Sequence, residues 1–291
     1  MKRISLLLTV LLITVLSSRV LSQPDHASNN SLLWRISGKS LTKPSYIFGT
    51  MHMICRDDYV WTKKMETSLA ACDKVCLEMD IDDPAVIAKV TTGLINNTGK
   101  KLKDYFTPAQ YQLLKRYLKD SLGLDISLLQ QMKPIALESI MMTNGTDCAD
   151  PVSYEDSILK TAHKTDKEIM GLEDPEEQIA VLETIPVDTI INALIEEIQN
   201  TNKPDTDYQQ LIHAYKTQDI KTLYTLINLS KELGDMALFL DGRNEKWIPR
   251  MEGKMKVSSV FFAVGAGHLW GDNGVLNLLR KAGYTVTSAN Q

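Results

Sequence analysis

The stretch Ser45-Tyr-Ile-Phe-Gly-Thr-Met-His52 is matched near the other end of the chain by Ser259-Val-Phe-Phe-Ala-Val-Gly-Ala-Gly-His268. Each pattern predicts a short apolar β-strand, a turn of small residues and then a histidine, so each ends in a GxxH motif. In open α/β sheets, ligands bind at the carboxyl edge of the strands. The chain has only five histidines, so we expect these two to share one site built from both ends of the chain.

Apolar runs predict the other strands, and amphipathic spacings predict the helices between them. Thr107 before Pro108 predicts the start of a helix, and Gly283 predicts the end of another. The expected strands are 32–37, 45–51, 74–80, 167–173, 257–264 and 284–288, and the expected helices include 61–71, 153–163, 205–215 and 274–282.

Strands that alternate with helices are typical of α/β proteins. We therefore expect residues 32–291 to form a single α/β domain. Its central sheet is predicted to be mixed, mostly parallel and formed by the two chain ends. Residues from about 84 to 235 have a mainly helical pattern, which predicts a large helical insertion or cap over that sheet.

The N-terminus has the pattern of a secretory signal peptide. Two basic residues precede an apolar run at 4–16, and small residues lead up to Ser22. The run is too short for an ordinary transmembrane span. We expect a signal peptide at 1–22, cleaved near Ser22, and a disordered leader at 23–31, with an uncleaved membrane anchor as the alternative. No later segment has the length of a membrane span, so the predicted location is periplasmic or secreted.

The charge balance argues against nucleic acid as a partner. The chain has 32 basic and 36 acidic residues, and loss of the signal peptide would leave 29 basic against the same 36 acidic residues. Nucleic-acid binding depends on neutralisation of phosphates by basic side chains. An acidic protein of this kind is not expected to bind DNA or RNA.

Four cysteines follow the signal peptide, and an exported protein meets an oxidising compartment in which disulfides form. Cys55 and Cys148 lie in loop-like sequence, and we predict a bridge between them. Cys76 lies inside an apolar strand and is expected to be a buried thiol. Cys72 and Cys76 lack the CxxC spacing of a zinc site.

Three residues near strand ends have side chains suited to metal binding or proton transfer. Neutral imidazoles such as those of His52 and His268 bind divalent transition metals, and their pKa suits proton transfer near neutrality. Glu78 lies in the apolar stretch 75–80, where an unpaired charge would be costly. The alternatives are hydrogen-bonded structural histidines and a structural ion pair at Glu78.

Two further charged residues belong to the predicted site. Glu173 ends the expected strand 167–173, as Glu78 does near the end of its own strand. Arg243 follows Gly242, which interrupts a helical pattern, and a guanidinium there can hold a carboxylate or stabilise an oxyanion. The alternative for Arg243 is a loop residue that pairs with a surface acid.

Several common catalytic motifs are absent from the sequence. It has no GxSxG nucleophile elbow, no Walker loop, no GxGxxG fingerprint and no HExxH motif. A serine hydrolase of the α/β-hydrolase type, a P-loop nucleotide-binding protein and a thermolysin-like zinc peptidase are therefore not expected.

Taken together, these motifs resemble the TraB/GumN/PrgY family, a group that also includes the Tiki proteases and whose fold is similar to that of erythromycin esterase and ChaN-like proteins. The resemblance covers roughly residues 32–288. The residues that carry it are Ile47-Phe-Gly-Thr-Met-His52, Cys76-Leu-Glu-Met-Asp80, Gly171-Leu-Glu173 with Gln178, Arg243-Asn244, Phe262-Ala-Val-Gly-Ala-Gly-His268 and Gly283-Tyr-Thr-Val286.

The resemblance implies a metal-dependent hydrolase, and for the Tiki proteases a peptidase that uses Mn²⁺ or Co²⁺. His52 and His268 match the family's paired histidines and, with Glu78, are the expected metal ligands. Glu173 and Arg243 match the later glutamate and the late arginine of the family. Zn²⁺ is a further candidate, because imidazole and carboxylate groups also bind it.

The leading hypothesis is an exported metallohydrolase that acts on a peptide or on a small amide or ester. A divalent ion would acidify a water and polarise the scissile carbonyl. Glu78 or Glu173, whichever is not a ligand, would accept the proton, and Arg243 would stabilise the oxyanion. The alternative is a non-catalytic protein that sequesters a peptide signal, a metal or haem in the same cleft. The oligomeric state is not predicted.

Overall fold

The computed structural model describes residues 30–144, 148, 150–200, 206–229 and 237–289. The predicted signal peptide and the predicted leader up to Asn29 lie outside the described residues. Ser31, the last residue assigned to that leader, is fully buried, and its hydroxyl donates to Leu33 O at 2.6 Å. Ser31 therefore belongs to the folded domain.

A six-stranded sheet forms the centre of the domain, with the order β6-β4-β7-β2-β1-β8. Neighbouring strands from β6 to β2 are parallel, and β1 is antiparallel to both β2 and β8. The mixed, mostly parallel sheet predicted from the sequence is confirmed. The strands are β1 Leu33–Ser37, β2 Ser45–Thr50, β4 Lys74–Leu77, β6 Glu168–Gly171, β7 Val260–Gly265 and β8 Thr285–Ser288.

The two GxxH motifs lie side by side because β2 pairs with β7. The register aligns Gly49 with Val264 and Thr50 with Gly265. A Cβ at Gly49 would lie 2.7 Å from Leu269 Cδ1 and 3.1 Å from Ala266 Cα. Only glycine lets β2 approach the turn after β7 this closely, so the first motif makes room for the second.

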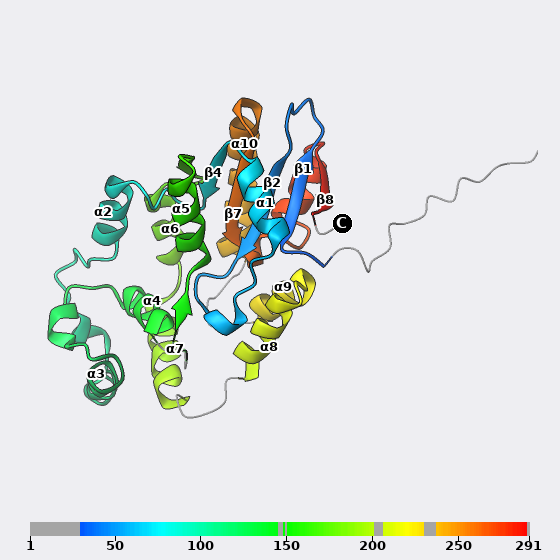
Figure 1. Ribbon diagram of the computed structural model, residues 1–291. Helices are drawn as coiled ribbons and strands as arrows, with labels where there is room; N and C mark the ends of the chain where they lie inside the picture. Colours follow the sequence, from blue (N-terminus) through cyan, green and yellow to red (C-terminus); the bar gives the residue numbers. More distant parts are fainter. Residues whose placement is uncertain (1–29, 145–147, 149, 201–205, 230–236, 290–291) are drawn as a thin grey trace, which may run out of the picture.

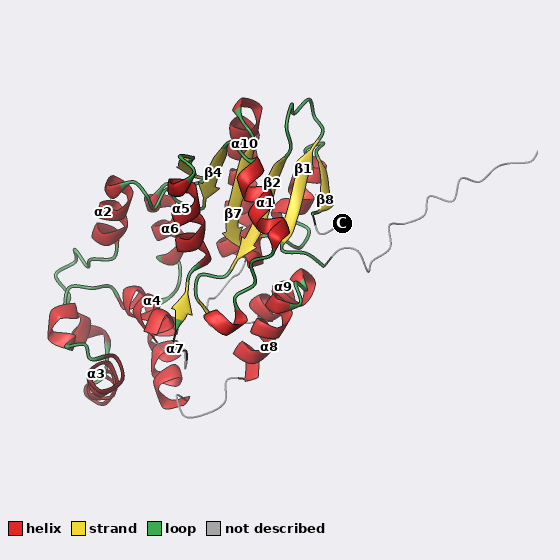
Figure 2. Ribbon diagram, viewed as in Figure 1, coloured by secondary structure: helices red, strands yellow, loops and turns green. Residues whose placement is uncertain are grey.

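Helices pack around the sheet, and a second group of helices lies to one side of it, at the lower left of Figures 1 and 2. Buried side chains of α1, α5, α8, α9, α10 and α11 belong to the same hydrophobic core as the strands. These helices are α1 Lys63–Ala71, α5 Tyr154–Lys164, α8 Thr206–Lys216, α9 Ile220–Leu229, α10 Gly242–Val257 and α11 Val275–Lys281.

The cap helices surround a separate hydrophobic core, which includes Leu114, Leu137 and Leu194. They are α3 Pro108–Leu122, α4 Pro134–Asn144 and α7 Val187–Asn200. Two shorter helices, α2 Pro84–Gly93 and α6 Pro175–Leu182, contact each other. Although residues 84–235 have a mainly helical pattern, α5, α8 and α9 from that range pack with the sheet, so the cap proper is smaller than the range.

Two short strands, which we call the two-stranded tie, connect the segment after β2 with the segment before α5. β3 Ile54–Cys55 pairs antiparallel with β5 Pro151–Val152. Cys55 and Cys148 form a disulfide beside this pair, which confirms the predicted bridge. Cys72 and Cys76 are buried free thiols, and burial raises the pKa of each to about 12.

Within the described ranges, no single helix is long and apolar enough to cross a membrane. Only α6 and α7 taken together meet that criterion, and they are bent by 80° relative to each other.

Candidate functional site

The predicted site residues come from the carboxyl ends of four neighbouring strands and from one helix. Glu78 directly follows β4, and Glu173 follows β6 by two residues. His52 follows β2 by two residues, and His268 ends a 3₁₀ turn directly after β7. The fifth residue, Arg243, belongs to the first turn of α10. The strand order β6-β4-β7-β2 therefore brings four of the five to one edge of the sheet.

Arg243 contacts three other residues of this cluster, Glu78, Glu173 and His268. Its Nη2 donates to Glu78 Oε2 at 2.5 Å and also to Glu173 Oε1, and its Nε donates to both Glu173 oxygens at 3.1 Å. The side chains of Arg243, Glu78 and Glu173 are 11%, 12% and 2% exposed. The expectation that Gly242 interrupts a helix is wrong, because Gly242 is the first residue of α10. The alternative that Arg243 pairs with a surface acid is also wrong, because its acidic partners Glu78 and Glu173 are buried.

His268 is a buried, neutral imidazole. Asn244 Nδ2 donates to Asn273 O at 2.9 Å, so its amide oxygen faces His268 Nδ1, which donates to it at 2.6 Å. The other ring nitrogen, Nε2, is then an acceptor and lies 3.2 Å from Arg243 Nη1. Burial lowers the pKa of His268 to about 3, although Glu78 acts against this shift.

Glu78 lies between the other groups of the cluster. Its Oε1 accepts from Gly265 N at 2.8 Å and lies 3.8 Å from His268 Nε2. Burial acts to raise the pKa of Glu78, but the His268 ring, which is charged at the low pH where Glu78 titrates, the charges of Arg243 and His52 and the Gly265 N–H outweigh it and lower the pKa to about 2. Glu78 is therefore ionised at neutral pH.

Trp247 of α10 packs in the hydrophobic core and also takes part in the cluster. It is fully buried, its Nε1 donates to Glu173 Oε2 at 3.0 Å, and its ring lies 4.4 Å from the His268 ring, centroid to centroid. Arg243, Asn244 and Trp247 share one face of α10, since residues four apart in a helix are neighbours. This spacing is visible in the sequence and identifies the face once α10 is known to begin at Gly242.

His52 has a different environment from His268. Its side chain is 73% exposed, and its Nδ1 lies 3.1 Å from Oε1 of Glu155 in the first turn of α5. This hydrogen bond, with the negative charges of Glu155 and Glu78, raises the pKa of His52 to about 9, and the exposure of the ring to water screens the pair. Glu155 was not identified from the sequence, because first-turn acids are common on helices.

A cavity of about 320 Å³ adjoins the cluster, and we call it the strand-end cleft. His52, Glu78, Glu155 and Gln178 form its polar part. Its apolar part consists of Met53, Leu77, Met79, Ile81 and Ala263. The other three predicted site residues do not line it, so Glu78 is the member of the buried cluster that faces the cleft.

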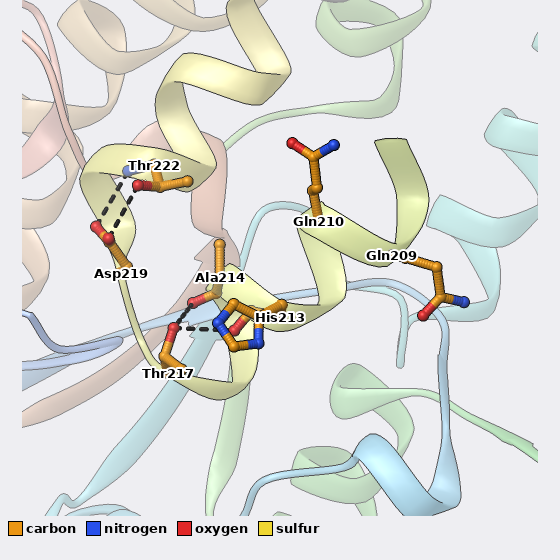
Figure 3. A pocket seen from close by; sticks show the side chains of 7 residues that line it. All are labelled: Gln209, Gln210, His213, Ala214, Thr217, Asp219 and Thr222. Atoms are coloured by element: carbon orange, nitrogen blue, oxygen red, sulfur yellow. Dashed lines mark hydrogen bonds between the residues drawn. The ribbon is translucent and has the colours of Figure 1, made fainter. Parts of the chain in front are cut away.

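A larger cavity, of about 420 Å³, lies between α8 and the start of α9 (Figure 3). Three of its polar side chains, those of Thr217, Asp219 and Thr222, take part in local turn hydrogen bonds. Thr217 Oγ1 donates to His213 O, and Asp219 accepts from Thr222 N and Oγ1. The ionisable groups of its lining show no converging charges, so the smaller strand-end cleft is the better candidate for chemistry.

The described residues fit a divalent metal in donor type and charge, although they are not gathered as a finished site. Among them, no three His, Cys, Asp or Glu side chains lie close enough together to hold an ion. Two of the expected ligands, Glu78 Oε1 and His268 Nε2, are 3.8 Å apart, close to the roughly 3.3–3.5 Å that bonds of about 2.0–2.2 Å in a tetrahedral site require. Two carboxylates, those of Glu78 and Glu173, face the single guanidinium of Arg243, so the residual charge of the buried cluster is negative.

Fold and site together define an α/β protein with a histidine, glutamate and arginine cluster at the carboxyl edge of its sheet. The chain belongs to the TraB/PrgY/gumN family, whose model matches residues 32–288. This result confirms the family resemblance found in the sequence.

Named relatives in this family are metalloproteases. The chain is 24% identical to the metalloprotease TIKI2 of Danio rerio, over 88% of this chain and 60% of the relative. It is also 24% identical to the metalloprotease TIKI1 of Homo sapiens, over 92% of this chain and 63% of the relative. The chain thus spans about three fifths of the length of these curated relatives. No solved structure matches it.

Proposed function

We propose that the protein is an exported, metal-dependent hydrolase that cleaves a peptide or a small amide or ester in the strand-end cleft. The observation that carries the proposal is the contact of ionised Glu78 with Arg243 and with the Gly265 N–H of the second GxxH motif, beside a cleft that His52 also lines. The relatives named metalloproteases support the same class of reaction.

The proposed metal ligands are His52, His268 and Glu78, and Mn²⁺ or Co²⁺ is the proposed ion, with Zn²⁺ as the alternative. When bound, such an ion supplies Lewis acidity, which makes a water more acidic and a carbonyl more electrophilic. His268 is neutral and presents Nε2 as an acceptor, as a ligand must. Binding at Nε2 requires Arg243 to release this one contact while it keeps its hydrogen bonds to Glu173.

Of the two glutamates, the geometry favours Glu78 over Glu173 for either role, as a metal ligand or, where the ion is held without it, as the base. Glu78 lines the strand-end cleft, so water that enters the cleft can reach its carboxylate and transfer a proton to it. Glu173 is 2% exposed and is held by both Arg243 and Trp247. Arg243 was expected to stabilise an oxyanion, but its donors already bind these carboxylates and His268. We therefore assign it the role of holding Glu78 and His268 in place.

The walls of the cleft favour an apolar group on the substrate. Met53, Met79 and Ile81 line the cleft beside Glu78, and all three are partly exposed. Methionine side chains are flexible and adapt to apolar partners of different shape. We expect the preferred peptides to carry an apolar side chain next to the scissile bond.

Metal analysis and peptide-library cleavage, with and without Mn²⁺ or Co²⁺, test this function. We expect metal-dependent cleavage that is lost in Glu78→Gln and His268→Ala and retained in His213→Ala, which changes an exposed histidine of the larger cavity. Unchanged metal content in Glu78→Gln would assign Glu78 as base rather than ligand. A protein that binds metal but cleaves no peptide would favour the binding-protein alternative, and a wild type that binds no metal contradicts the proposal.

Export is part of the proposal, and two observations support it. The sequence at 1–22 has the pattern of a signal peptide, and the Cys55–Cys148 disulfide suits an oxidising compartment. Expression of the full chain, followed by intact-mass measurement of the protein outside the cytosol, should give a chain that begins at Gln23. An unprocessed chain confined to the cytosol would contradict this part of the proposal.

A further inference from the structure

Glu155 forms a carboxylate–imidazole pair with the first GxxH histidine. Its Oε1 accepts from Thr50 Oγ1 at 2.7 Å and lies 3.1 Å from His52 Nδ1, while its Oε2 accepts from Ser153 Oγ at 3.1 Å. The Glu155 side chain is 15% exposed, whereas that of His52 is 73% exposed. A well-anchored acid thus lies beside a ring that faces water and the cleft.

The anchoring of Glu155 settles which ring nitrogen of His52 carries the proton. An ionised carboxylate only accepts hydrogen bonds, and both oxygens of Glu155 already accept from hydroxyl groups, Oε1 from Thr50 Oγ1 and Oε2 from Ser153 Oγ. Nδ1 of His52 must therefore be the donor in this pair. In a neutral ring, the lone pair is then left on Nε2, at the edge away from Glu155.

We propose that Glu155 is a positioning residue that fixes the orientation and tautomer of His52, so that Nε2 faces the strand-end cleft. The inference rests on the proposed function for its purpose, because Nε2 is the atom that would bind a divalent ion. Histidines that bind metals usually donate their other N–H to a carboxylate or carbonyl, which sets the ring for its ligand. His268 has the same arrangement through Asn244, whose oxygen accepts from Nδ1 at 2.6 Å.

The fold holds the two partners together although they come from distant parts of the chain. Ile54 pairs with Val152 and Cys55 with Pro151 in the two-stranded tie, and the Cys55–Cys148 disulfide adds a covalent link. His52 lies two residues before this tie, and Glu155 lies three residues after it. Both side chains therefore start from a backbone fixed on either side, and their contact does not depend on a free loop.

The test is nitrogen NMR of the His52 ring in the full-length protein, with His52→Gln used to assign its signals. Spectra are recorded above the titration midpoint of the ring, which the same spectra give, so that the ring is neutral. We expect the Nδ1–H tautomer in the wild type. Glu155→Gln should retain it, because the amide oxygen still accepts from both Thr50 Oγ1 and Nδ1. Glu155→Ala should shift the ring toward the Nε2–H tautomer.

The matched control is Glu176→Ala, which removes a first-turn glutamate of α6 that pairs with Lys89 on the surface and should leave the His52 signals unchanged. Titration with Mn²⁺ gives a second readout: we expect Glu155→Ala to weaken binding by about 10–100-fold and Glu155→Gln to recover most of it. An Nδ1–H tautomer that persists in Glu155→Ala overturns the proposal. The tautomer is measured without substrate or metal, so this outcome is distinct from a failure of the proposed hydrolase function.

Discussion

At the scale of the residue, Arg243 has the greatest influence on the site. One guanidinium contacts Glu78, Glu173 and His268, and it lies over the Trp247 ring with Cζ 4.9 Å from the centroid. Each of these partners is itself held by another group, such as the Gly265 N–H at Glu78. A substitution of Arg243 therefore leaves the buried carboxylates of Glu78 and Glu173 without a counter-charge, in addition to removing their contacts.

Arg243→Met is expected to destabilise the protein strongly. The substitution keeps the apolar volume but leaves Glu78 and Glu173 without their counter-charge, and removing one partner of a buried ion pair costs about 3–5 kcal/mol. Urea unfolding measures this cost. Arg250→Met serves as the control, because Arg250 pairs with Glu177 at 37% and 28% exposure, where a pair contributes about 1 kcal/mol or less. Equal costs for the two variants would contradict the buried-network interpretation.

At the scale of the element, the Arg250–Glu177 pair ties α10 to α6. Arg250 Nη1 and Nη2 donate to the two oxygens of Glu177 at 2.7 and 2.9 Å, and Nη1 also donates to Leu172 O at 2.8 Å. The side-chain hydrogen bond from Arg250 is the largest cause that lowers the pKa of Glu177 from 4.5 to about 2. The Arg250–Glu177 pair, with the hydrogen bond to Leu172 O, therefore holds α10, the helix that carries Arg243, against the end of β6.

The stabilisation from this pair should vanish in acid. A carboxyl with a depressed pKa in the folded state stabilises the fold above its unfolded value, and this contribution is lost as the pH falls from about 4.5 towards about 2. The difference in free energy of unfolding between wild type and Arg250→Met should be constant above about pH 5 and then shrink. Arg280→Met is the control, because Arg280 donates to Val286 O and to no carboxylate. A pH-independent difference for Arg250→Met would refute the prediction.

The disulfide should matter for the tie that positions His52. Replacing both Cys55 and Cys148 by serine is expected to lower the free energy of unfolding by about 2–5 kcal/mol, because a bridge across a sequence separation of 93 constrains the unfolded chain. Hydrogen exchange should show lower protection at Ile54 and Val152. Reductant should destabilise the wild type and have no further effect on the double variant. Equal sensitivity of both proteins to reductant would contradict this account.

The main strands were predictable from the sequence, and the two short strands β3 and β5 of the two-stranded tie were not. Apolar runs such as Val260–Gly265 are buried along almost their whole length, so their hydrophobicity reveals them. β3 and β5 have two residues each, too few for any period to show.

Thr107 caps α3 as predicted, since capping depends on neighbouring residues alone. The start of α10 was missed because glycine usually weakens helices, whereas here packing of Trp247 and its neighbours decides.

At the scale of the whole molecule, the predicted grouping of residues at one sheet edge was correct where it depended on topology. His52, Glu78, Glu173 and His268 follow strands that proved to be neighbours, and that rule acts through the sheet alone. The partners that orient the histidines, Glu155 and Asn244, come from helices, and no local pattern separates them from ordinary helix residues. The sequence therefore predicted which residues gather at this edge, and only the tertiary structure shows how the imidazoles of His52 and His268 are held.

The two hydrophobic cores should respond separately to mutation. Leu114 is fully buried in the cap core, and Leu276 is 1% exposed in the sheet core. Each change to alanine should cost about 2–5 kcal/mol. Native-state hydrogen exchange should show lost protection in α3, α4 and α7 for Leu114→Ala, and in the sheet for Leu276→Ala. Uniform loss across the molecule in both variants would mean that the two cores open as one unit.

The parallel pairing of β2 with β7 also determines when, during synthesis of the chain, the cluster at the sheet edge can form. A ribosome completes Ser45–Thr50 well before it reaches Val260–Gly265, and at about 5–20 residues per second the interval is roughly 10–40 s. Throughout that interval the nascent chain lacks the second histidine and leaves the edge of β2 open to other partners. The cluster of His52, Glu78, Glu173 and His268 can form only after Val260–Gly265 and His268 have been synthesised, so a chain interrupted before that point lacks it.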